Sequence, residues 1–187
     1  MKEQTNPQQY TADNILNYWF EELTATQWFE QDTTLDWDIA KRFSDVHFHA
    51  AQLDFLHWRE SAQGRLAEIL ILDQFSRHIY RGTPLSFAFD GSALALAQEA
   101  VAIHALEELE QALRNFLLMP FMHSESLWIH QVAEPLFVQY ADEQTCSYAW
   151  KHREVIEQFG RYPHRNAVLD RETTADERVY LAAHPGF

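Results

Sequence analysis

The segment from Leu66 to Asp90 places the strongest constraint on the fold. Its first part, LAEILILDQF, is one of the most apolar stretches in the chain. Apolar side chains at such mixed spacings cover a helix nearly all round, which is typical of a helix at the centre of a protein. The segment then turns polar, with Asp73 and Arg77 one helical turn apart, and breaks at Gly82. We therefore predict a central buried helix that ends in a polar cluster.

The other apolar residues also recur at helical spacing. From Leu35 to Trp58 an apolar residue returns every three or four positions, which indicates a long amphipathic helix. The same periodicity predicts helices over residues 15–23, 86–104, 106–119, 127–140 and 143–159, and a last short helix after Thr174. Residues 161–171 are expected to form an ordered loop.

Several residues are suited to begin or end these helices. Ser61, Ser124 and Thr174 have side chains that can accept hydrogen bonds from the first backbone N–H groups of a helix. Gly160 follows residues 143–159 and matches a C-terminal cap. Pro120 lacks a backbone N–H group, so we expect the helix over 106–119 to stop there.

These patterns predict an all-α protein of about seven to nine helices in antiparallel pairs. The chain has only five Gly and six Pro among 187 residues, which favours long helices, and no segment alternates as a strand would. Residues 1–10 are polar and are predicted to be a flexible N-terminal segment. Residues 11–187 are predicted to form a single all-helical domain.

Charge excludes some classes of partner. The formal net charge is -14, so the protein should repel nucleic acid and anionic lipid. From Lys151 to Arg171 the balance reverses, with five Lys or Arg against three acids. This basic stretch can either hold a small anion or supply internal ion pairs, and the sequence leaves both readings open.

Metal, disulfide and membrane roles receive no support from the sequence. Cys146 stands alone, which excludes an internal disulfide and a multi-cysteine metal site. The ten His residues match no metal-ligand spacing, so we predict neither a metal nor a cofactor. The N-terminus lacks the apolar core of a signal peptide, and no run approaches the roughly 20 apolar residues of a membrane span. We expect a cytoplasmic protein.

Several motifs together carry a resemblance to a known family. They read YWF at 18–20, LDQFSRHIYRG at 72–82, FAFD at 87–90, LMPFMHSE at 118–125 and FGRYPHRN at 159–166. In this order they resemble the bacterial family called domain of unknown function 924. The resemblance implies an all-helical fold similar to tetratricopeptide-repeat proteins, and it implies no activity. Ser76 and His78 stand where the family pattern has proline and asparagine.

The resemblance and the shared setting of these motifs predict that ten polar residues converge. Within this group, His123, His164 and Asp73 are candidates for acid–base catalysis. The others are candidates for binding an anionic ligand, because guanidinium groups suit carboxylate and phosphate. Each residue can alternatively be part of the scaffold, as a partner in a buried ion pair. The candidate ligand-binding residues are Arg77, Arg81, Asp90, Glu125, Arg161, Arg165 and Asn166.

Two functions follow as hypotheses. The first is a module that binds a partner protein or peptide in a groove of a repeat-like superhelix. The second is an enzyme or sensor that binds a small anion, a phosphate or a carboxylate, at the cluster of Arg, His and Asp residues. The sequence predicts no reaction, no identified partner and no oligomeric state.

Overall fold

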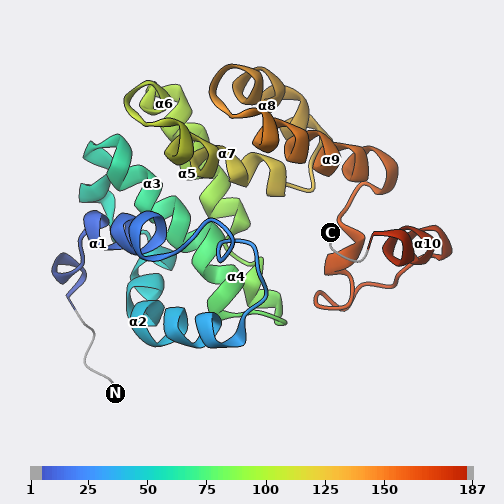
Figure 1. The fold of residues 1–187 in the computed structure, drawn as a ribbon, viewed down its shortest axis with the longest axis horizontal. Helices are drawn as coiled ribbons and strands as arrows, with labels where there is room; N and C mark the ends of the chain where they lie inside the picture. Colours follow the sequence, from blue (N-terminus) through green and yellow to red (C-terminus); the bar gives the residue numbers. More distant parts are fainter. Residues whose placement is uncertain (1–5, 185–187) are drawn as a thin grey trace.

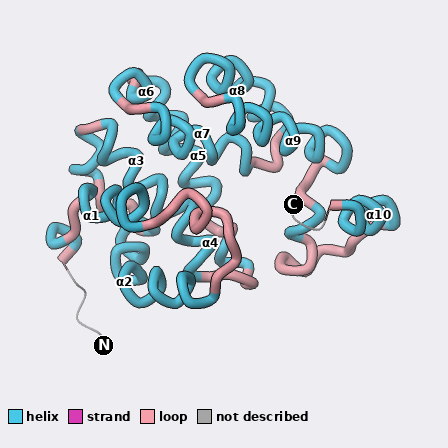
Figure 2. The backbone as a smooth tube through the Cα atoms, viewed as in Figure 1, coloured by secondary structure: helices cyan, strands magenta, loops and turns pink. Residues whose placement is uncertain are grey.

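The computed structural model describes residues 6–184, and every regular element in that range is helical (Figures 1 and 2). The predicted all-α class is confirmed. The helices are α1 (Ala12–Asn17), α2 (Thr33–Ala51), α3 (Ala62–Leu70), α4 (Ser76–Ile79), α5 (Asp90–Ala102), α6 (Ala105–Glu108), α7 (Gln111–His123), α8 (Leu127–Tyr140), α9 (Glu143–Phe159) and α10 (Ala175–Ala183). Residues 1–5 of the segment predicted to be flexible lie outside the described range, and Pro7–Gln9 form a 3-10 turn.

The centre of the molecule is one continuous helix. A π-helical turn, Ile71–Phe75, joins α3 to α4 without a break. Its apolar side chains are completely buried, as the sequence predicted, and the helix is packed against α1, α2, α5 and α7. This burial places the polar residues of the same helix, beginning at Asp73, at the end of the hydrophobic core. The fully buried apolar residues are Leu66, Ala67, Ile69, Leu70, Ile71, Leu72 and Phe75.

Three predicted helix ends are confirmed. The Ser61 hydroxyl accepts a hydrogen bond from the backbone N–H of Gly64 at 3.0 Å. Thr174 and Glu177 form a reciprocal capping box at the start of α10. Gly160 ends α9 in the left-handed conformation, with φ of 68°.

Several predicted boundaries are wrong. The helix predicted over 86–104 begins at Asp90, and the helix predicted over 106–119 is divided into α6 and α7. Helix α2 ends at Ala51 instead of continuing to residue 58, because Leu53 adopts a left-handed conformation and Leu56–Glu60 form a 3-10 turn. Helix α7 continues through Pro120 to His123, since its last turns are buried in the core. The residue that precedes α8 is Ser126, and the Ser124 hydroxyl accepts a hydrogen bond from its backbone N–H at 3.2 Å.

The C-terminal part of the chain packs beside the main body. Helices α7, α8 and α9 lie against one another, and the chain then passes through a 3-10 turn, Pro163–Arg165, to reach α10 (Figure 1). A small second core under this part consists of Val155, Ile156 and Tyr162. No helix within residues 6–184 combines the length and the apolar character that crossing a membrane requires.

Candidate functional site

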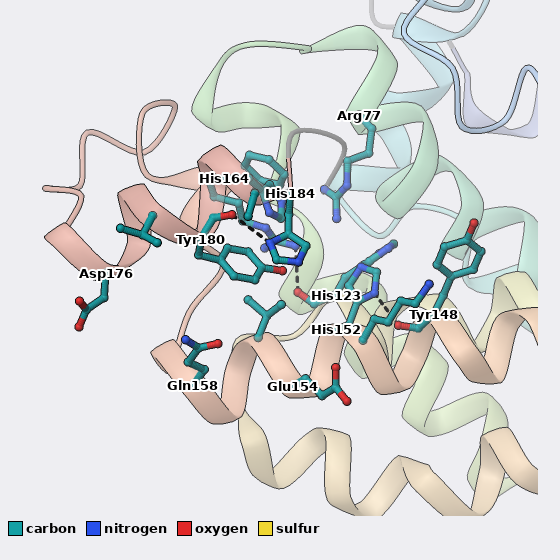
Figure 3. Close-up of a pocket in the computed structure, with 16 residues that line it drawn as sticks. Arg77, His123, Tyr148, His152, Glu154, Gln158, His164, Asp176, Tyr180 and His184 are labelled. Carbon is teal, nitrogen blue, oxygen red and sulfur yellow. Dashed lines mark hydrogen bonds between the residues drawn. The ribbon is translucent and has the colours of Figure 1, made fainter.

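A cavity of about 1150 Å³ lies between α4, α9, α10 and the C-terminal end of α7. Arg77, His123, His164 and Arg165 line it, so four predicted site residues from three separate parts of the chain meet at one cavity. Figure 3 shows the histidine side chains gathered in its middle, with the Arg77 guanidinium group directed toward them.

Asp73 and His123 form a buried pair at the inner wall. The Asp73 side chain is 1% exposed, and its Oδ1 lies 2.7 Å from Nδ1 of His123. Burial raises the pKa of Asp73, but the interactions with His123 and Arg77 outweigh it and hold the pKa at about 2. Because the carboxylate accepts the Nδ1 hydrogen, Nε2 is the nitrogen of His123 available for other chemistry.

Two arginines share the carboxylate of Asp90. Arg77 Nη1 lies 2.7 Å from Asp90 Oδ1, and Arg165 Nη1 lies 3.0 Å from Asp90 Oδ2. Arg165 also donates a hydrogen bond to the backbone oxygen of His123 at 3.0 Å. Both guanidinium groups pack on the ring of Phe87, with Cζ at 4.9 Å and 4.5 Å from its centroid. The result is a rigid, predominantly buried cationic wall.

The neighbouring imidazoles are neutral near pH 7. Burial lowers the pKa of His152 to about 3 and that of His164 to about 4. Neighbouring histidines add to the shift of His152, and Arg165 and Arg77 add to that of His164. His152 Nδ1 donates to the backbone oxygen of Tyr148 at 2.8 Å, which fixes the ring at the cavity wall. The His152 and His123 rings lie 6.1 Å apart. These imidazoles therefore bring little positive charge to the cavity.

Three predicted residues bind partners away from the cavity. Arg81 binds Asp36 of α2 through two hydrogen bonds of 2.5 Å and 2.8 Å. Arg161 binds Glu177 of α10 at 2.6 Å and 2.9 Å, and Asn166 donates to the same carboxylate at 3.2 Å. The prediction that all ten residues converge is wrong at these positions. Their partners are buried or half-buried carboxylates that join neighbouring elements, which is the scaffold alternative.

Glu125 also serves the scaffold. Its carboxylate forms a bidentate ion pair with Arg171, at 2.7 Å and 2.9 Å, and accepts a 2.8 Å hydrogen bond from the backbone N–H of Tyr162. These contacts tie residues 161–171 to the connection between α7 and α8. Glu125 lies beside Arg165 at a smaller neighbouring cavity of about 310 Å³.

Sequence reasoning placed Lys151 in a basic stretch but did not include any α9 residue among the candidate site residues. Tyr148, Lys151, His152 and Val155 all line the cavity. Their spacing of three, four and seven residues places them on one face of a helix, and this spacing is a signal that was present in the sequence. Within the described range, no group of three or more His, Cys, Asp or Glu side chains is arranged to hold a metal ion.

Comparison with known proteins agrees with the fold and provides no activity. A solved structure of a protein of unknown function from Agrobacterium tumefaciens is 37% identical, with a TM-score of 0.86 over 92% of this chain and 97% of that one. No curated protein matches the sequence. The model of a family described as bacterial protein of unknown function, DUF924, matches residues 15–185. The chain therefore belongs to the DUF924 family.

Proposed function

We propose that the protein binds a small organic anion in the cavity between α4, α9 and α10. The observation that carries the proposal is the meeting of three cationic side chains there: Arg77, Lys151 and Arg165, from three separate segments. Arg77 and Arg165 share one carboxylate, that of Asp90. Lys151 is solvent-exposed, and its ammonium group lies 5.4 Å from the ring centroid of Tyr148.

The donor set fits a carboxylate or a phosphate. Guanidinium and ammonium groups supply charge, and neutral imidazole N–H groups can add hydrogen bonds without repelling the cations beside them. The buried position of Arg165 raises the strength of its interactions, since its side chain is only 8% exposed. Its Nε has no hydrogen-bond partner within the described part of the chain.

Thermal unfolding with a panel of anions tests the proposal. Carboxylates and phosphates should raise the melting temperature by mass action, and neutral amides of the same shape should not. The variant Lys151→Gln should weaken anion binding about fivefold, which corresponds to roughly 1 kcal/mol. Lys41→Gln, the same change on the exposed face of α2, is the matched control and should leave the affinity unchanged. An absence of stabilisation by every anion would contradict the proposal.

An enzymatic use of this cavity would rest on His123. The Asp73 carboxylate fixes the imidazole and can stabilise its protonated form, as carboxylates do for catalytic histidines in other enzymes. Proton transfer through Nε2 to or from the bound anion is the chemistry that this pair is suited to perform. His164, at its lowered pKa, can accept a hydrogen bond or proton only weakly near pH 7.

The partner-binding module is the second candidate, and a different surface favours it. Helix α8 exposes Trp128, Val132 and Val138, at 68%, 41% and 67%. Exposed apolar side chains on one helix are a common feature of protein interfaces, and repeat-like packing would present them on an extended face. Trp128→Ser should leave anion binding unchanged and weaken any binding of a peptide. Lys151→Gln should weaken anion binding and leave any binding of a peptide unchanged.

A further inference from the structure

We infer that the anion is an amphipathic monocarboxylate, meaning one carboxylate group attached to an apolar body of several carbon atoms. The inference rests on the proposed function, because it names the class of molecule that the same cavity takes. Three features of the cavity carry it: its size, the charge at its inner end and the apolar side chains at its outer end.

The volume is far larger than an inorganic anion needs. A water molecule occupies about 30 Å³ of liquid, and pockets for organic ligands measure about 300–1,000 Å³. The cavity, at about 1150 Å³, is slightly larger than the upper limit of that range. A phosphate or acetate held by the cationic wall would fill a small part of it. A ligand that uses the cavity fully therefore has a body beyond its charged group.

The charge at the inner end suits a single negative charge. Three cations, Arg77, Lys151 and Arg165, line the cavity together with two exposed carboxylates, Glu154 and Asp176. Behind the wall, Asp73 and Asp90 pair with the two arginines. The neighbouring imidazoles of His152 and His164 add little positive charge near pH 7. This set of charges leaves no cation for a second carboxylate on the ligand. A dianion would bring an uncompensated negative charge into a partly desolvated site.

Most side chains that line the outer end are apolar and come from two helices. Val155 of α9 is buried, and Val179, Tyr180 and Ala183 of α10 face the same cavity. The polar residues on this side are Gln158, Asp176 and His184. Val179 is 73% exposed, which is unfavourable for an apolar side chain. A ligand body that covers this side chain would remove it from water and so gain binding free energy. Figure 3 shows Tyr180 beside His184, at some distance from Arg77. The cavity thus has a charged end and an apolar end, as an amphipathic molecule does.

Calorimetric titration with acetate, butyrate, hexanoate and octanoate tests the inference, with the alcohols of equal length and succinate as comparisons. Each added CH₂ group should tighten binding about fourfold until the apolar end is full. Octanol should bind far more weakly than octanoate. Succinate should bind more weakly than butyrate.

Two matched variants locate the apolar end. Val179→Asp should remove most of the gain from acetate to hexanoate, and Val138→Asp, the same change at an exposed valine of α8, should keep it. Lys151→Gln should weaken the binding of all the acids by a similar factor. If acetate and octanoate bind equally well, the inference is overturned and the proposed function stands. If no acid binds, the proposed function fails as well. Equal affinity for octanol and octanoate would contradict the claim that the cationic residues recognise the carboxylate.

Discussion

At the scale of single residues, His47 shows how a polar group is accommodated in the core. Its side chain is fully buried, and Nε2 lies 2.8 Å from the hydroxyl of Ser76. That hydroxyl in turn donates to the backbone oxygen of Leu72 at 2.6 Å, so it accepts from the imidazole. Ser76 occupies the position where the family pattern has proline, which could not accept this hydrogen bond. Burial lowers the pKa of His47 to about 4.

This lowered pKa makes His47 a source of acid sensitivity. The folded-state pKa lies below the usual value of 6.5, so the unfolded chain binds a proton first as the pH falls. The stability contribution is fully present above pH 6.5 and is lost between pH 6.5 and about 4. In His47→Gln, the free energy of unfolding should fall less steeply as the pH falls through this window. The difference between the slopes of the two proteins should be about 1.4 kcal/mol per pH unit. Urea unfolding at several pH values measures both slopes, and equal slopes would contradict the prediction.

The site residues differ in how readily the sequence predicts them. Asp73 and Arg77 are four residues apart on one helix, and their contact of 3.4 Å follows from helical geometry alone. Asp73 and His123 are fifty positions apart, and only the packing of α7 on the central helix brings them together. Arg81 obeys the same local pattern as Arg77 but points to Asp36 on α2. Spacing along one helix therefore predicts which residues share a face, and it does not predict which helix that face meets.

At the scale of helices, two glycines in regular helical positions should respond oppositely to alanine. A Cβ atom on Gly64 in α3 would lie 1.9 Å from the backbone oxygen of Trp58, so the 3-10 turn before the helix would have to move. Gly64→Ala should lower the free energy of unfolding by about 1–3 kcal/mol. Gly91 in α5 has nothing within 4 Å of that position, and Gly91→Ala should raise it by about 0.5–1 kcal/mol. Urea unfolding of both variants checks the signs, and two changes of the same sign would refute the steric account.

Helix ends were predictable where a local hydrogen bond decides them. Ser61, Thr174 and Gly160 act on backbone groups within a few residues, so their effects do not depend on distant packing. Pro120 was misleading because burial of the last turns of α7 outweighs the lost backbone hydrogen bond. The periodicity through Leu53 and Leu56 was equally misleading. Both side chains are exposed, at 46% and 70%, and they continue the pattern without continuing the helix.

At the scale of the molecule, the part of the chain that follows α9 is joined to the main body by several polar contacts near the cavity. The apolar core beneath it is small and is built on Val155, Ile156 and Tyr162. Glu125 pairs with Arg171 and accepts the backbone N–H of Tyr162, so one carboxylate holds two points of the segment 161–171. Because α10 follows that segment, the position of the apolar end of the cavity depends on this attachment.

Removing the charge of Glu125 should therefore loosen residues 161–171 without unfolding the central helix. In Glu125→Gln, backbone amides of this segment that exchange by local opening should exchange about fivefold faster, which corresponds to roughly 1 kcal/mol. Amides of α3 should keep their protection, because they are buried far from this contact. Hydrogen exchange followed by mass spectrometry resolves the two regions.

Glu134→Gln is the matched control for that experiment, because Glu134 forms a 2.6 Å ion pair with Arg153 between α8 and α9, and its side chain is half exposed. That surface pair should contribute little, so exchange over 161–171 should stay as in the wild-type protein.

Faster exchange throughout Glu125→Gln would show that the ion pair of Glu125 with Arg171 stabilises the whole fold. Unchanged exchange would show that packing alone holds the segment. A local change alone means that the ion pair of Glu125 with Arg171 sets the stability of the segment that leads to α10, so that the position of the outer side of the cavity depends on one carboxylate.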